Sequence, residues 1–79
     1  MTPNNIANII KERRKILKIT QEQLAEMAEV GLRNLKSIEN AKSNPTISTI
    51  NKLAVVLGME LKLEIKKQVE LNDEKSKNI

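Results

Sequence analysis

The spacing of apolar residues changes once along this chain. From Pro3 to about Lys18, from Thr20 to Asn40 and from Thr46 to Gly58, apolar residues recur every three to four positions. That repeat is typical of α-helices that bury one face. Residues 59–66, MELKLEIK, instead alternate apolar and charged residues, which is typical of a half-buried β-strand. The pattern predicts four helices followed by one strand.

Capping residues support these helix boundaries. Thr2 precedes Pro3, a favourable first helical residue, and Thr46 stands where it would cap the last helix. Thr20 lies three residues before Gln23, the spacing of a capping box. Gly58 follows the last helix and suits a left-handed C-cap.

Residues 20–40 are predicted to form two short helices separated by a tight turn. Leu24, Ala25 and Ala28 form a narrow apolar stripe in the first helix, and the alanines allow another helix to approach closely. The turn at residues 29–31 interrupts the helical pattern, and Val30 is placed to fill the angle between the two helices.

The second of these helices has two different faces. Leu35 and Ile38 point toward the predicted core. The opposite face carries polar side chains at i, i+3, i+4 and i+7, which are Arg33, Lys36, Ser37 and Asn40. A short helix with a thin apolar back and a row of hydrogen-bonding side chains in front suits insertion into a polar groove, so we interpret it as a DNA-reading helix.

The predicted strand requires a partner for its backbone groups, and a second copy of the chain would provide one. Antiparallel pairing about Leu63 places Leu61 opposite Ile65. On the other face the same register places Glu60 opposite Lys66 and Lys62 opposite Glu64, which are favourable cross-strand pairs. We therefore predict a homodimer joined through Leu61, Leu63 and Ile65. A fifth helix, or a strand that pairs with another protein, are the alternatives.

Composition excludes several function classes. The 79 residues allow one small domain with a limited core. They include no Cys and no His, which removes thiol nucleophiles, disulfides, ordinary zinc sites and imidazole bases. The absence of Phe, Trp and Tyr argues against single-strand binding by base stacking. No nucleophile–base pair, metal constellation or phosphate-binding glycine loop is visible, so we expect no enzyme, no cofactor and no metal.

The charge is distributed unevenly. The net charge is +4, and all of this excess lies in residues 1–58, which hold nine Lys and Arg against five Asp and Glu. Residues 59–79 hold five of each sign. A basic helical half is compatible with nucleic acid, although a solvated Lys-rich surface would have the same composition. No apolar run reaches membrane length and no signal peptide is visible, so we expect a cytoplasmic protein.

The sequence thus divides into three parts. Residues 1–58 are expected to form the helical domain, residues 59–67 the dimerisation strand, and residues 68–79 a polar, flexible tail.

Several motifs, in the same order, resemble those of the Cro/C1-type (Xre family) helix-turn-helix repressors. They are residues 20–25 (TQEQLA), Val30, residues 38–40 (IEN) and residues 44–46 (NPT). The last motif is residues 53–58, which begin with Leu-Ala and end with Leu-Gly. The resemblance covers about residues 5–58 and implies a lambda-repressor-like domain of four helices. The Gly-Leu-Arg opening at residues 31–33 and the following strand resemble the HipB-like antitoxins, which repress their own operon and bind a HipA-type kinase toxin.

The resemblance assigns roles to individual residues. The positions that contact bases or the DNA backbone in such proteins correspond to Gln21, Leu32, Arg33, Asn34, Lys36, Ser37, Asn40 and Lys42. Glu39 corresponds to an internal polar residue that anchors the fold rather than contacting DNA. The chain departs from the family at Glu29, where many members have glycine, and at Gly31, where they have Ser or Thr. Leu32 replaces a polar reader and could touch a thymine methyl group or pack against the core.

These features predict a repressor that binds double-stranded DNA as a dimer. Two reading helices would enter successive major grooves about 34 Å apart, on a near-palindromic operator. The antitoxin of a HipBA-like operon, with a HipA-like kinase as its partner, is the first interpretation. A stand-alone phage-like or restriction-controller regulator is the alternative. A third possibility is an interaction module whose helix-turn-helix no longer binds DNA.

Overall fold

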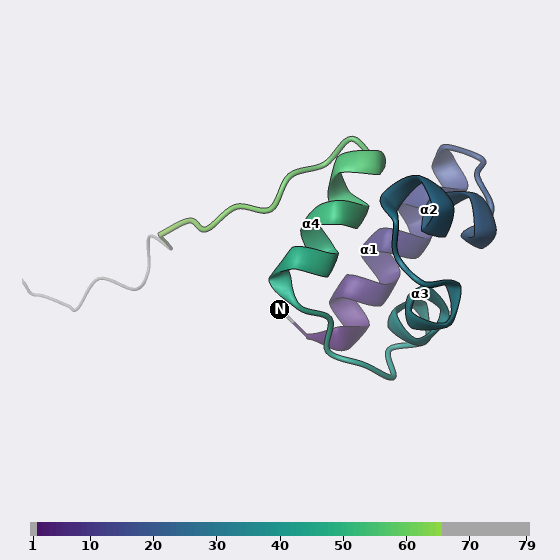
Figure 1. Ribbon diagram of the computed structural model, residues 1–79. Coiled ribbons are helices and arrows are strands. Elements are labelled where there is room, and N and C mark those ends of the chain that lie inside the picture. The colour runs from purple at the N-terminus through teal and green to yellow at the C-terminus, as the bar shows by residue number, and fades with distance from the viewer. Residues whose placement is uncertain (1, 66–79) are drawn as a thin grey trace, which may run out of the picture.

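The computed structural model describes residues 2–65 and contains four α-helices (Figure 1). Helix α1 spans Pro3–Ile16, α2 spans Gln21–Ala28, α3 spans Leu32–Glu39 and α4 spans Ile47–Val56. Helix α3 packs against α1 and α2, and α4 packs against α2. The mainly α-helical architecture and the count of four helices over these residues confirm the prediction.

The predicted caps are present. The hydroxyls of Thr2, Thr20 and Thr46 each accept a hydrogen bond from the backbone N–H three residues later, at 3.2, 3.0 and 3.1 Å. At Thr20 the side chain of Gln23 completes the capping box by accepting from the Thr20 N–H at 2.8 Å. Gly58 ends the last helical region at a φ of 71°, in the left-handed region, as predicted.

The turn between α2 and α3 is tight although it contains no left-handed glycine. Glu29 occupies the left-handed region at a φ of 58°. The next N–H, of Val30, donates to the carbonyl of Ala25 at 2.9 Å, which satisfies a carbonyl at the end of α2. Val30 is partly buried against the core, as its predicted role requires.

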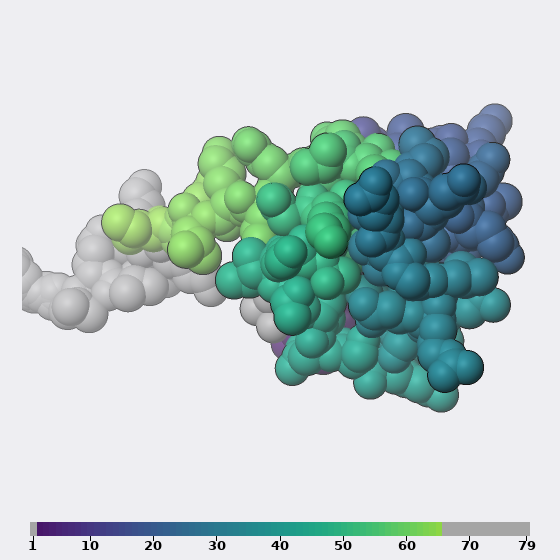
Figure 2. All heavy atoms as spheres, in the orientation of Figure 1, coloured from purple at the N-terminus to yellow at the C-terminus, as the bar shows by residue number. Residues whose placement is uncertain are grey.

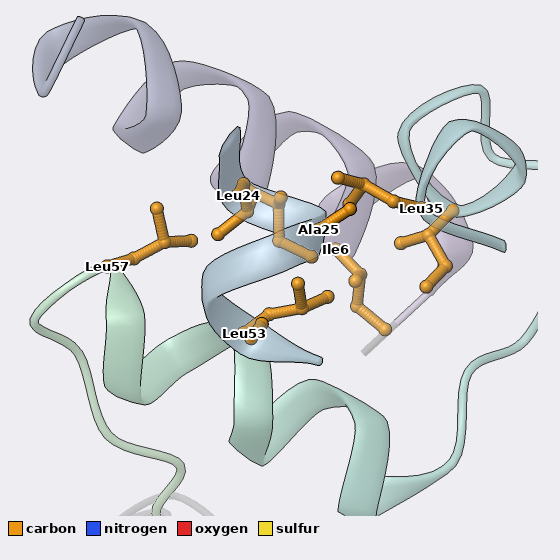
Figure 3. Packing of buried hydrophobic residues seen from close by; sticks show 9 residues of the cluster. Ile6, Leu24, Ala25, Leu35, Leu53 and Leu57 are labelled. Atoms are coloured by element: carbon orange, nitrogen blue, oxygen red, sulfur yellow. The ribbon is translucent and has the colours of Figure 1, made fainter. Parts of the chain in front are cut away.

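The core is aliphatic and draws on all four helices (Figure 3). Leu24 of α2, Leu35 of α3 and Leu53 of α4 are completely buried. Ala25 and Ala28 are buried too, and their small side chains let the neighbouring helices come close to α2. Outside this core, the Arg13 Nε of α1 donates to the carbonyl of Leu57 at 2.9 Å and so links α1 to the C-terminal end of α4.

Not every apolar residue of the helical repeat enters the core. Ile47 falls on the apolar stripe of the last helix, but its side chain is 73% exposed. Ile47 is the first residue of α4, and the buried contacts of that helix come from residues further along, such as Leu53 and Ala54. Periodicity fixes the direction of a side chain around the helix axis, but it does not show how far the neighbouring helices extend along that axis.

Residues 59–65, called the arm below, leave the helical body as an extended segment (Figures 1 and 2). No strand is present in the part of the chain that the structure describes, residues 2–65. Leu63 and Ile65 are fully exposed or nearly so. The predicted strand pairs two copies of the chain, and residues 2–65 of one copy offer it no backbone partner, so the pairing stays a prediction. Residues 66–79, including Lys66 and the predicted tail, lie outside the described residues.

Within residues 2–65, none of the helices has the length and apolar character needed to cross a membrane.

The capping box at the start of α2 has a measurable contribution to stability. Thr20→Ala removes the hydroxyl that accepts from the Gln23 N–H, and we expect it to lower the free energy of unfolding by about 1 kcal/mol. Ser48→Ala, at an exposed position of α4, is the control and should change stability by less than about 0.5 kcal/mol. Urea denaturation followed by circular dichroism measures both, and equal effects would contradict the capping role.

Candidate nucleic-acid interface

A buried carboxylate joins the helices around α3. Glu39, the last residue of α3, is 2% exposed. Arg14 of α1 donates to both of its oxygens, from Nε to Oε2 at 2.9 Å and from Nη2 to Oε1 at 3.0 Å. The Arg14 side chain is itself only 13% exposed. Parallel contacts of this kind fix the orientation of both groups as well as their distance.

The same cluster includes the start of α2. The Gln21 Nε2 donates to the Glu39 Oε1 at 3.1 Å. The Arg14 Nη1 donates to the carbonyl of Ile19 at 3.1 Å, in the segment that connects α1 to α2. Glu39 therefore accepts hydrogen bonds from α1 and α2 while belonging to α3. This cluster, Arg14–Gln21–Glu39, fixes the C-terminal end of α3 on the other two helices.

Helix α3, fixed by this cluster, exposes a polar face on its other side. Leu35 and Ile38 are buried under the helix. The side chains predicted to read DNA point outward, with Ser37 half-buried and the others exposed: Arg33, Asn34, Lys36 and Asn40. The structure thus places these predicted residues on a single outward face. Two of them are cations, and the only carboxylate of α3 is buried with Arg14.

The outer surface of α2 has the opposite charge. Glu22, Glu26 and Glu29 are all exposed, and residues 21–28 contain no Lys or Arg. Glu29 lies beside Lys52 and Val55 of α4, on the wall of a shallow hollow. A polyanion would be repelled by this surface and attracted by the outer face of α3. Of the two outer faces, that of α3 is therefore the more favourable one for a polyanion.

The segment after α3 presents one more cation. The Lys42 N–H donates to the carbonyl of Ser37 at 2.9 Å, and Ala41 takes a left-handed conformation with a φ of 59°. The backbone around Lys42 is thus fixed against the end of α3, while its side chain is exposed. This placement suits the backbone-contacting role predicted for Lys42.

Two predicted contact residues have internal contacts. Leu32 is half-buried and packs against the core cluster, which agrees with the packing alternative left open for it. Gln21 is half-buried and uses its amide nitrogen to bind Glu39. The predicted anchoring role of Glu39 matches its burial and hydrogen bonds.

Sequence reasoning did not find the partners of these groups. A buried carboxylate requires a cationic partner, and the sequence pattern does not identify Arg14 as that partner. The signal available in the sequence was Glu39 itself, but five cations lie between residues 11 and 18 and the pattern does not distinguish among them.

Comparison with known proteins agrees with this geometry. Residues 10–63 match the helix-turn-helix family, a range that covers the second half of α1, all of α2 to α4 and much of the arm. The chain belongs to the helix-turn-helix family of the Cro/C1 (Xre) type. An immunity repressor protein of Bacillus phage phi105 is 35% identical over 77 residues, which cover 89% of this chain and 54% of that protein. The chain thus spans about half the length of this relative.

The family assignment also clarifies the turn. Many members of this helix-turn-helix family have glycine where this chain has Glu29, and Glu29 adopts the left-handed conformation that glycine favours. The chain thus forms a left-handed turn at this position without glycine. Gly31 precedes α3 and offers no side chain to cap that helix. A Cβ atom added at Gly31 would have no other atom within 4 Å, so the position has room for a side chain. The family is one of DNA-binding regulators, and the narrower likeness to HipB-like antitoxins is not shown.

The Arg14–Gln21–Glu39 cluster predicts a large loss of stability when one charge is removed. Glu39→Ala leaves the Arg14 guanidinium without its anion, and we expect the free energy of unfolding to fall by about 3 kcal/mol. Glu26→Ala removes an exposed carboxylate and should change it by less than about 0.5 kcal/mol.

The double variant Arg14→Met with Glu39→Leu keeps the volume and removes both charges, so it should be more stable than Glu39→Ala. Thermal and urea denaturation of the set measures this. A double variant no more stable than Glu39→Ala would contradict the importance of the uncompensated charge.

Proposed function

We propose that this helix-turn-helix protein is a transcriptional repressor that binds a specific double-stranded DNA site by placing α3 in the major groove. The outward row of hydrogen-bonding side chains on α3, from Arg33 to Asn40, carries this proposal. An α-helix with its side chains is about 10–12 Å across, which fits the roughly 12 Å width of the major groove.

Different side chains of the row suit different parts of the duplex. Arg33 lies near the start of α3, and its planar guanidinium fits the O6 and N7 acceptors of guanine. Asn34 fits the N6 and N7 of adenine in the same way. Lys36 is suited to a guanine or to a phosphate, because its single ammonium group imposes no fixed geometry. Asn40 lies at the end of the helix and Lys42 two residues after it, so both suit contacts to the DNA backbone.

Gln21 connects this face to the internal cluster. Its amide nitrogen is committed to Glu39, which leaves its carbonyl oxygen as an acceptor. A phosphate requires donors, and the amide can supply one further N–H to it. We infer that Glu39 orients Gln21 at the edge of the interface, next to the end of α3.

As a dimer, the repressor would bind an operator that contains two half-sites. Two copies of α3 would lie about 34 Å apart and read a near-palindromic sequence, with the arm residues Leu61, Leu63 and Ile65 joining the copies. Occupation of promoter DNA by the dimer then blocks transcription. The similarity to a phage immunity repressor supports a stand-alone regulator of this kind.

An antitoxin is the second candidate. An antitoxin needs a surface for a protein partner as well as one for DNA, and the exposed apolar residues of the arm could form it. The Gly31-Leu32-Arg33 opening of α3 also favours an antitoxin, because it resembles that of the HipB-like antitoxins. The two candidates share the same DNA interface. Co-purification of a kinase-type protein from the native operon would favour the antitoxin, and its absence would favour the stand-alone repressor.

Arg33 tests base readout. We expect Arg33→Ala to weaken binding to the cognate site by about 1–3 kcal/mol and to relax the sequence preference at one position. Cognate DNA is obtained by selection from a randomised duplex library, and binding is measured by gel shift on that site and on unrelated DNA. An equal loss on both DNAs would contradict guanine recognition and make Arg33 a phosphate contact.

Lys42 tests the backbone contact. Lys42→Ala should weaken binding to all sequences by a similar factor and reduce the slope of log K against log salt by about one. Lys52→Ala is the matched control, since Lys52 is an exposed cation of α4 in the hollow lined also by Glu29. Fluorescence anisotropy over a salt series measures both slopes, and equal slopes for the two variants would exclude the proposed contact.

A further inference from the structure

An apolar groove lies between α1, α4 and the arm. The free volume of this groove is about 80 Å³. Its walls are formed by Ile6, Ile9 and Ile10 of α1, by Ile50 and Ala54 of α4, and by Leu61 of the arm. A water molecule needs roughly 10–15 Å³ of such space, so the groove has room for a branched aliphatic side chain, and its walls offer water few polar partners.

The arm has two faces of different character. The Lys62 Nζ and the Glu64 Oε2 lie 3.8 Å apart, so the charged residues come together on one side. Leu61 and Leu63 alternate with them. Leu61 lines the groove of its own copy, whereas Leu63 and Ile65 lie beyond it and remain exposed. Within residues 2–65, one copy therefore has both an open apolar groove and two apolar side chains that no described residue covers.

The register predicted for the arm connects these features. Antiparallel pairing about Leu63 places Ile65 of a second copy directly opposite Leu61, with Cβ atoms about 4.5–5.5 Å apart. Since Leu61 lines the groove, that Ile65 arrives at the groove's edge. The twofold symmetry makes the arrangement reciprocal, so both grooves are filled at once.

We propose that the groove between α1 and α4 of one copy binds Ile65 from the arm of a second copy. The inference rests on the homodimer of the proposed function and adds the surface that receives the exchanged arm. Charge favours a second copy over another protein, because Lys62 then lies opposite Glu64 of the other arm and the pairing is self-complementary. The two arms would form a ribbon whose apolar face covers both grooves.

Single-cysteine variants test this contact. The sequence contains no Cys, so Ile9→Cys and Ile65→Cys each carry one thiol and cannot form a disulfide within a chain. Equal amounts of the two variants are mixed under mild oxidation, and the disulfide-linked heterodimer is measured by mass spectrometry. We expect it to form at least about tenfold faster than with Val55→Cys in place of Ile9→Cys, because docking raises the local thiol concentration. Val55 is an exposed α4 residue that lines a different hollow.

The Ile65→Cys variant alone provides a second control. In the predicted register two copies of residue 65 are offset by four residues, about 13 Å, which exceeds disulfide reach. A heterodimer with Ile9→Cys that forms no faster than with Val55→Cys would overturn the proposed groove contact.

A further variant separates this inference from the dimer itself. Leu63→Cys places its thiol on the twofold axis and should cross-link to its own copy. Rapid cross-linking of Leu63→Cys without any Ile9–Ile65 product would keep the ribbon and exclude the groove contact. A wild-type protein that sediments as a monomer, both free and on cognate DNA, would contradict the dimer and the groove contact together.

Ile65→Ser should raise the dimer dissociation constant by at least about tenfold and leave the helical circular dichroism signal unchanged, since Ile65 is 96% exposed in one copy.

Discussion

The contact between Arg14 and Glu39 fixes α3, and with it the exposed polar face of this helix, on the rest of this small protein. A carboxylate removed from water requires strong compensation, and Glu39 obtains it from a bidentate guanidinium and the amide of Gln21. The three side chains come from α1, α2 and α3, so the helices cannot rotate independently without breaking a buried ion pair. An aliphatic contact in the same place would fill the volume with much less directional constraint.

This constraint matters because the aliphatic part of the core restricts the orientation of the helices only weakly. Leu24, Leu35 and Leu53 are joined by short aliphatic and alanine side chains, and described residues 2–65 include no aromatic anchor. Such a core stabilises compactness more than a unique helix orientation. The polar cluster complements it by fixing the C-terminal end of α3. The exposed row on α3 is then presented in one orientation, while the exposed carboxylates of α2 give the neighbouring surface the opposite charge.

Much of this arrangement follows from local sequence signals. Threonine caps, the helical repeat and the polar row of α3 predicted the four helices and the outward face of Arg33 and Lys36, because these signals act within a few residues. The pairing of Arg14 with Glu39 spans 25 positions, and five nearby cations could have filled the role, so only the packed structure selects one. The exposure of Ile47 likewise depends on where neighbouring helices end. The predicted strand depends on a second chain, and its pairing stays a prediction for that reason.

The central claim, that α3 is held with its polar row toward DNA, is tested most directly by nuclear magnetic resonance. Backbone amide signals of the labelled protein are followed while a duplex selected from a randomised library is added. We expect the largest shift changes at Arg33, Asn34 and Lys36 and only small changes at Lys52 and Val55 on the outer side of α4. Large changes on α4 with none along α3 would contradict it.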